Sequence, residues 1–218
     1  MMRLEGKRKV RLTERDLYVS KWIAEQGAVR LDTIGLLLRL SNSAVDDRAL
    51  RRLAERWVAL GLIEKARLLA NAPSILWPTP EGMRSAGLTL GRGERASKPG
   101  FSTLHHSLAV SRVRLEYPVV SAEWTCERAL RKEIGGAHLA DGMATFPQGR
   151  VLVEVDRTQK EKSRLVNIMA ANARMPGIIR VDYWTTPGLQ KFVTAQRDLL
   201  DVGIRERVAV FLLPEEVR

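Results

Sequence analysis

One stretch, Ser43 to Leu60, restricts what this chain can fold into more than any other part of it. Its apolar residues recur at the spacing that lays a single stripe along an α-helix: Leu50, Leu53, Trp57 and Leu60, beside Val45, Ala49 and Ala54. The opposite side carries Arg48, Arg51, Arg52 and Arg56, with Asp47 and Glu55 among them. We expect Ser41, Asn42 or Ser43 to cap the start of this helix and Gly61 to end it. Such a helix needs a core on one side and suits a negatively charged partner on the other.

Two shorter helices are expected before this basic helix. Thr13 is expected to cap a helix that carries acids in its first turn and ends at Gly27. A second helix, rich in Leu and Ile, is expected from about Asp32 to Leu40. Three helices with a short middle one are typical of a helix-turn-helix, in which the third helix recognises DNA.

Two short strands are expected after the basic helix. They run over Leu62–Leu68 and Ile75–Pro78, about a polar turn, and form the wing of a winged helix, with Lys65 and Arg67 placed to reach a DNA backbone. A short helix starting at Thr79-Pro80-Glu81 closes the domain near Ala86. We therefore expect a winged helix-turn-helix domain over residues 12–87, preceded by a basic arm (1–11) that is either solvated or lies along phosphates. A glycine-rich linker (88–100) follows it.

The charge distribution favours a polyanion partner for the N-terminal half. The formal net charge is +11; residues 1–100 hold 19 Lys or Arg against 11 Asp or Glu, and residues 101–218 hold 17 against 14. The alternative is that the charge serves only solubility. The single cysteine, Cys126, excludes an internal disulfide and a cysteine-based zinc cluster, and we expect its thiol to be buried and inert. No apolar run approaches the ~20 residues of a membrane span, and the N-terminus lacks a signal-peptide core, so we expect a cytoplasmic protein without a membrane partner.

Residues 101–218 alternate between helical and strand patterns. Helical segments are expected near 103–117, 124–131, 159–174 and 189–200, and strands near 137–146, 150–156, 178–185 and 208–213, with a tight turn at Pro147-Gln148-Gly149. This order predicts an α/β domain in which crossover helices join parallel strands.

Carboxylates gather on the expected strand pair. Alternation places Val151, Val153 and Val155 on one face and Glu154 and Asp156 on the other. If Phe146 pairs with Val151, Asp141 falls opposite Asp156. Like charges across a ladder are unfavourable, so we expect an offset from a divalent cation such as Mg²⁺, which would activate water against a phosphodiester, or from Lys160, Lys162 and Arg157. The alternative is an exposed strand face whose acids are solvated.

Other candidate ligands near the carboxylates keep two interpretations each. Glu127 either joins the acids or pairs with Arg131 four residues on. The histidines, His105, His106 and His138, are interpreted as capping or surface residues, with phosphate contact as the alternative. No His-x-x-x-His spacing occurs, so a zinc site is not expected.

Several short motifs occur in a recognisable order. They are LTERD (12–16), RALRRLAERWVALGLIEK (48–65), HSLAV (106–110), ERALR (127–131), ADG (140–142) and VEVDRT (153–158). In these motifs the sequence resembles the replication-relaxation family of plasmid and mobile-element proteins over nearly the whole chain. The resemblance implies an N-terminal winged helix joined to a restriction-endonuclease-like PD-(D/E)XK domain, and DNA binding in plasmid replication, transfer or their control.

The resemblance also implies roles for particular residues. Glu127, Asp141 and Glu154 fill the three acidic positions of the nuclease pattern, but Asp156 stands where the pattern has lysine. Lys160 or Lys162 would then supply the positive charge from the next helix. This departure favours a degenerate domain used for structure, dimerisation or DNA contact.

Three functional hypotheses follow. The first is a sequence-specific double-stranded-DNA-binding protein, a regulator of transcription or an accessory factor of replication or transfer, with no enzymatic activity and no required cofactor. Its DNA-binding residues are Ser43, Asp47, Arg48, Arg51, Arg52, Arg56, Lys65 and Arg67. The second is a Mg²⁺-dependent DNA endonuclease targeted by the winged helix, with Asp141, Glu154 and Asp156 as metal ligands and Glu127, Asp141, Glu154 and Lys160 as the catalytic set. The third is a winged helix that serves protein contacts.

Overall fold

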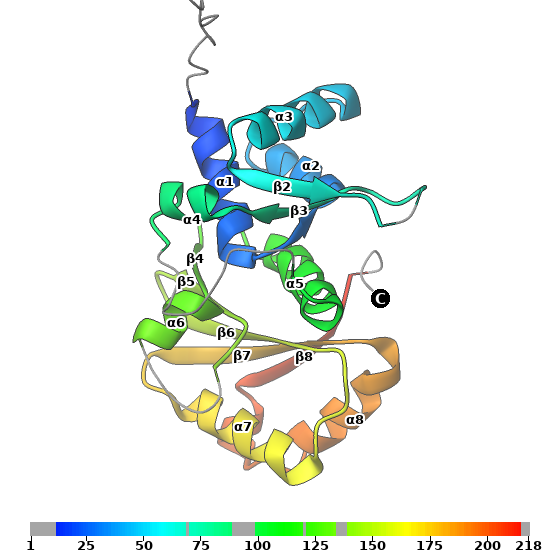
Figure 1. The fold of residues 1–218 in the computed structure, drawn as a ribbon. Helices are drawn as coiled ribbons and strands as arrows, with labels where there is room; N and C mark the ends of the chain where they lie inside the picture. The colour runs from blue at the N-terminus through cyan, green and yellow to red at the C-terminus, as the bar shows by residue number, and fades with distance from the viewer. Residues whose placement is uncertain (1–11, 69, 89–98, 120, 134–138, 215–218) are drawn as a thin grey trace, which may run out of the picture. The chain divides into compact units, whose positions relative to one another are not determined.

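The structure, a computed structural model, describes residues 12–68, 70–88, 99–119, 121–133 and 139–214. The predicted basic arm, most of the predicted linker and His138 lie outside this described part. The fold is mixed α/β with two separate sheets (Figure 1). The chain divides into two compact units: one runs to Pro99 except for Gly35–Val45, and the other starts at Gly100 and also includes Gly35–Val45.

The first hundred residues form short helices and a small antiparallel sheet. In chain order the elements are α1 (Glu14–Gln26), β1 (Val29–Arg30), α2 (Leu31–Leu40), α3 (Asp47–Ala59), β2 (Ile63–Ala66), β3 (Ile75–Pro78) and α4 (Pro80–Ser85). The strand order is β1-β3-β2. The helices were expected from the sequence, as was the β2–β3 pair, whereas the two-residue strand β1 was not.

Helix α1 begins and ends as its sequence predicts. The Thr13 side chain accepts a hydrogen bond from the Asp16 N–H, and the Asp16 carboxylate accepts one from the Thr13 N–H, which completes a capping box. Gly27 ends the helix with φ 75°, a conformation that favours glycine.

Helix α3 starts later than its sequence pattern predicts. Its N-cap is Asp46, whose carboxylate accepts a hydrogen bond of 2.6 Å from the Ala49 N–H. The expected caps Ser41, Asn42 and Ser43 were wrong, because this segment forms the turn that ends α2, with Asn42 in the left-handed region at φ 55°. The apolar stripe is buried as predicted, through Leu50, Leu53, Ala54 and Trp57.

The second unit is built on a five-stranded mixed sheet. Its elements are α5 (Phe101–Val113), a 3₁₀ turn (Arg114–Glu116), β4 (Glu123–Cys126), α6 (Glu127–Glu133), β5 (Gly142–Phe146), β6 (Gly149–Asp156), α7 (Lys162–Arg174), β7 (Ile178–Thr185), α8 (Pro187–Arg197), α9 (Val202–Arg205) and β8 (Val208–Leu212). The strand order is β4-β5-β6-β7-β8, antiparallel as far as β6 and parallel from β6 to β8. The predicted crossover helices between parallel strands are therefore present.

The β5–β6 hairpin has a tighter turn than expected. Phe146 pairs with Gly149, not with Val151, so the predicted register was wrong by two residues. Gly149 makes the tight turn possible: its φ is 142°, and a Cβ there would lie 2.4 Å from the Ile179 side chain. The ladder ends at the Gly142–Val153 pair. Asp141 directly precedes this pair and Glu154 directly follows it, so Asp141 lies beside Glu154 and not opposite Asp156.

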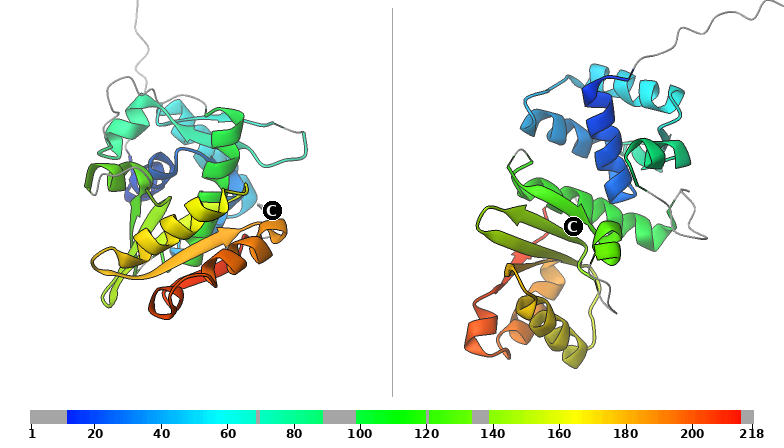
Figure 2. Two further views of the ribbon diagram at one scale, coloured as in Figure 1. Left: turned by 90° about the horizontal axis from the view of Figure 1, so that it is seen from below. Right: turned by 90° about the vertical axis from the view of Figure 1, so that its left-hand side faces the viewer.

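The shift by two residues leaves the predicted faces of β6 unchanged. Val151, Val153 and Val155 pack in a core with residues of α5, whereas Leu152 packs on the other face with residues of α7. Figure 2 shows α5 on one side of this sheet and α7 and α8 on the other. Glu154 and Asp156 face α7 and are only 2% and 5% exposed, so the alternative of solvated acids is wrong for these two residues.

Candidate functional site

An exposed basic surface lies on α3. Arg48, Arg51 and Arg52 are exposed, and none of them is hydrogen-bonded or ion-paired to another residue in the described part of the chain. The opposite side of the helix is anchored by Leu50 and Trp57, which are 5% and 1% exposed. We call these three arginines the arginine trio; their guanidinium groups are available to a partner.

Arg56, on the same helix, has a different environment. Its Nε and a terminal nitrogen donate to Asp16 Oδ2 at 3.2 and 3.0 Å, and the Trp57 indole N–H donates to Asp16 Oδ1 at 2.9 Å. Burial alone would raise the pKa of Asp16, but hydrogen bonds from Thr13, Trp57 and Arg56 lower it below its usual value. Arg56 thus belongs to the contact between α1 and α3, and its guanidinium, unlike those of the arginine trio, is ion-paired within the protein.

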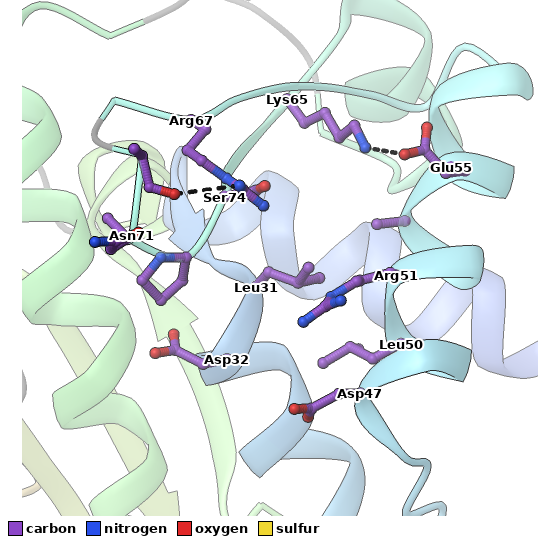
Figure 3. A pocket seen from close by; sticks show the side chains of 14 residues that line it. Leu31, Asp32, Asp47, Leu50, Arg51, Glu55, Lys65, Arg67, Asn71 and Ser74 are labelled. Atoms are coloured by element: carbon purple, nitrogen blue, oxygen red, sulfur yellow. Dashed lines mark hydrogen bonds and ion pairs between the residues drawn. The ribbon is translucent and has the colours of Figure 1, made fainter.

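A pocket separates α3 from the β2–β3 hairpin (Figure 3). Arg51 and Asp47 line it from α3, and Lys65 reaches from β2 to form an ion pair with Glu55 of α3. Arg67 donates to the Ala70 carbonyl at 3.2 Å and so lies along the hairpin turn. The pocket therefore carries groups of both charges, and its cations come from both elements.

The remaining member of the predicted set, Ser43, lies before the helix. It is four residues ahead of the first residue of α3, and its hydroxyl donates to the Ser41 carbonyl at 3.4 Å. Asp47 is the first residue of α3 and is exposed. Ser43 therefore precedes α3 and Asp47 begins it, and the arginines follow along the helix.

The second unit holds a cluster of three acids, two of which are buried. We define the acidic cluster as Asp141, Glu154 and Asp156. Asp141 Oδ1 is 2.7 Å from His106 Nε2, and its Oδ2 accepts a hydrogen bond of 2.7 Å from the Val155 N–H. Glu154 and Asp156 lie at the end of β6, Asp141 is the residue before β5, and His106 lies on α5. The sheet and its covering helix therefore bring the acids and the histidine together.

Two further side chains engage the acids at the end of β6. Lys160 Nζ lies 2.5 Å from Asp156 Oδ1, and Asn172 of α7 donates to Glu154 Oε1 at 3.0 Å. Burial alone would lower the pKa of Lys160, but the charges of Asp156, Glu154 and Asp141 raise it above its usual value. Lys160, not the exposed Lys162, is thus the lysine that faces the acids.

Tyr183 of β7 lies on the same side of the sheet and is fully buried. Burial, followed by the charges of Glu154 and Asp156, raises the pKa of Tyr183 well above its usual value. Its hydroxyl lies beside Asn172 but makes no hydrogen bond of normal geometry within the described residues. A neutral phenol oxygen is therefore held next to the acidic cluster.

His106 is the member of this site that the sequence did not indicate. It was expected to cap a helix or lie on the surface, but it binds Asp141, 35 residues further along the chain. The hydrogen bond to Asp141 raises the pKa of His106, against the opposing effect of burial. Its only sequence signal was its place in the HSLAV motif, since no periodicity connects it to Asp141.

The other candidate ligands are also placed by the structure. Glu127 pairs with Arg131 at 2.7 Å, the surface pair that was one of its two interpretations. His105 packs edge-on against Phe101, with ring centroids 4.4 Å apart. Cys126 is buried, as predicted.

Within the described ranges, no group of three or more His, Cys, Asp or Glu side chains has an arrangement that could hold a metal ion. Among the described helices, none combines the length and apolar character needed to cross a membrane. In comparisons with known proteins, no family model, curated protein or solved structure matches the chain. The resemblance to the replication-relaxation family therefore stays a prediction, and function has to be argued from the two sites.

Proposed function

We propose that this chain is a sequence-specific double-stranded-DNA-binding protein in which α3 enters the major groove. The observation that carries the proposal is the arginine trio, exposed along one side of a helix whose other side is buried. The order α1, α2, α3 and then the β2–β3 hairpin supports a winged helix-turn-helix, in which the third helix is the one that recognises DNA.

The spacing of the trio suits base recognition. Arg48, Arg51 and Arg52 stand at i, i+3 and i+4, so they share one side of α3. A guanidinium group presents parallel donors that match O6 and N7 of guanine, and each such pair discriminates against the wrong base by about 1–3 kcal/mol. The proposed target therefore contains guanines in adjacent major-groove positions.

The hairpin would add contacts to the DNA backbone. Arg67 is exposed, and the Lys65 ammonium can exchange its ion pair with Glu55 for an ion pair with a phosphate. Such contacts fix the register of the protein on the duplex but carry no sequence information. Recognition and positioning are thus assigned to different elements.

The biological setting is proposed from the resemblance to the replication-relaxation family. We assign the chain a role as a regulator or as an accessory factor of replication or transfer on a plasmid or other mobile element. The mixed sheet with helices on both faces is compatible with a restriction-endonuclease-like second unit, used here for structure, dimerisation or DNA contact. No cofactor is needed for this function.

A Mg²⁺-dependent endonuclease is the second candidate. The gathering of Asp141, Glu154 and Lys160 at one end of β6 favours it. The Lys160 ammonium weighs against it, because it lies at an Asp156 oxygen and supplies positive charge where a metal ion would.

The test compares DNA binding by the full-length protein and two triple variants of equal charge. A site is first selected from a random duplex library and then footprinted with and without Mg²⁺. Replacing Arg48, Arg51 and Arg52 together by alanine is expected to weaken binding to the selected site at least about 100-fold. The control replaces the exposed Arg131, Arg164 and Arg174 of the second unit by alanine and should keep the footprint.

Two results would contradict the DNA-binding proposal or extend it. Equal affinity of the trio variant and the wild type would overturn the assignment of α3 and favour a winged helix that binds protein. Cutting that requires Mg²⁺ and disappears in Asp141→Ala would establish the endonuclease instead.

A further inference from the structure

The acidic cluster contains a cation that the chain itself supplies. We infer that Lys160 takes the place of a divalent cation in this cluster, so that the second unit neutralises its buried acids with an ammonium group. The Lys160 ammonium is 2.5 Å from Asp156 Oδ1, and the Lys160 side chain is 24% exposed. This inference concerns the second unit alone and does not depend on how α3 binds DNA.

The donors around the acids explain why a metal ion does not fit. Both oxygens of Asp141 are engaged, one by His106 and one by the Val155 N–H. Glu154 Oε1 accepts from Asn172, and Asp156 Oδ1 faces Lys160. A divalent cation would have to approach the Asp156 oxygen that the Lys160 ammonium occupies, whereas the Val155 N–H and Asn172 are neutral donors that leave the charge of their carboxylates unbalanced.

The chain geometry brings Lys160 to this position. Strand β6 ends at Asp156, and α7 begins at Lys162, so Lys160 lies in the short connection between them. The connection returns the lysine side chain toward the end of the strand, where Glu154 and Asp156 are buried beneath α7. Buried charges are stable only when paired, and the lysine provides that pairing.

The balance of charge predicts what removal of the ammonium would do. Three carboxylates face Lys160, and the charge of Glu127 also acts on His106, so loss of Lys160 leaves excess negative charge beside the buried Glu154 and Asp156. The Tyr183 hydroxyl, buried without a hydrogen bond of normal geometry in the described part, adds a further oxygen on the same side of the sheet. Oxygen ligands with excess negative charge are what Mg²⁺ and Mn²⁺ bind.

The experiment asks whether losing the ammonium opens a metal site. Full-length wild type, Lys160→Met and the matched control Lys162→Met, which changes the neighbouring exposed lysine, are titrated with Mn²⁺ and followed by electron paramagnetic resonance and by thermal unfolding. Wild type and Lys162→Met are expected to hold no ion at the cluster. Lys160→Met should unfold at a lower temperature, bind about one Mn²⁺ per chain and regain part of its thermal stability.

A second substitution identifies the site. Adding Asp141→Asn to Lys160→Met should abolish both Mn²⁺ binding and the gain in thermal stability. If Lys160→Met does not fold, Lys160→Gln, which keeps a polar end group, carries the same titration.

Two outcomes overturn the inference. One is a wild-type protein that binds Mn²⁺ and loses that ion on Asp141→Asn, because the lysine would then not be excluding the metal. The other is a folded Lys160 variant that gains no Mn²⁺ site.

Discussion

At the scale of single residues, Asp16 shows how one side chain can hold a recognition helix in place. Asp16 lies in the first turn of α1, where a negative charge interacts favourably with the helix dipole, and the sequence pattern indicates only this role. In the structure it is fully buried and accepts hydrogen bonds from Trp57 and Arg56 of α3. The same carboxylate thus caps one helix and positions another.

Asp16→Ala is expected to destabilise the protein by about 2–3 kcal/mol at neutral pH, because it leaves the buried Trp57 N–H and the Arg56 guanidinium without their acceptor. The folded state lowers the pKa of Asp16, so its contribution to stability is complete above the unfolded pKa of about 3.9 and is lost as the pH falls through the folded value. Urea unfolding at a series of pH values should show a wild-type advantage that is constant from about pH 5 to 7 and shrinks in acid.

Glu14→Ala is the control for Asp16→Ala, since Glu14 is an exposed acid in the same helical turn. Its effect should stay within about 0.5 kcal/mol. An Asp16→Ala variant as stable as wild type at pH 7 would contradict the account of the α1–α3 contact.

At the scale of elements, regularity decided what the sequence could predict. The helices with a clear apolar period and the eight-residue strand β7 were found at or near their observed bounds. Strand β1 has two residues and β4 has four, immediately followed by α6, so neither carries enough residues to show a period of two. The hairpin register depended on the backbone conformation of Gly149, which no pattern of apolar residues reports.

The candidate sites followed the same rule. The basic side of α3 was predicted because it repeats along one helix, whereas the ion pair of Arg56 was not, because its partner, Asp16, lies 40 residues away. The gathering of Asp141, Glu154 and Asp156 was predicted in outline from strand alternation. The hydrogen bond between His106 and Asp141 was not predicted, since it depends on how α5 packs against the sheet.

The start of α3 provides a test at this scale. Asp46→Ala removes the N-cap acceptor of the Ala49 N–H and is expected to cost about 1 kcal/mol in the free energy of unfolding, measured in urea. Asp47→Ala, one residue on, removes an exposed acid that makes no capping hydrogen bond and should cost less. Equal losses would mean that the helix end is held by charge near its N-terminus, not by the cap.

At the scale of the whole molecule, the excess positive charge and the acidic cluster lie in different halves of the chain. Most of the net charge of +11 belongs to the first hundred residues, where the arginine trio lies, and the acidic cluster belongs to the second unit. A protein that binds DNA through such a surface releases counterions from the duplex, so its affinity falls with salt in proportion to the phosphates it contacts.

The joint variant Lys65→Ala and Arg67→Ala is expected to weaken binding to all duplexes to a similar degree. It should also reduce the slope of log affinity against log salt by roughly 1–2, because each lost phosphate contact contributes about 0.9. Fluorescence anisotropy on the selected site and on an unrelated duplex, from low to moderate salt, measures both effects. An unchanged slope would show that the hairpin does not contact the backbone.

The strand order of the second unit has a consequence for the way this protein is made. From β4 to β8 each strand lies beside the one synthesised immediately before it. A nascent chain emerging from the ribosome can therefore add one strand at a time to the edge of the sheet, and no later strand has to insert between two earlier ones. Vectorial synthesis and the final topology agree here, which shortens the time during which unpaired strand edges are exposed to aggregation.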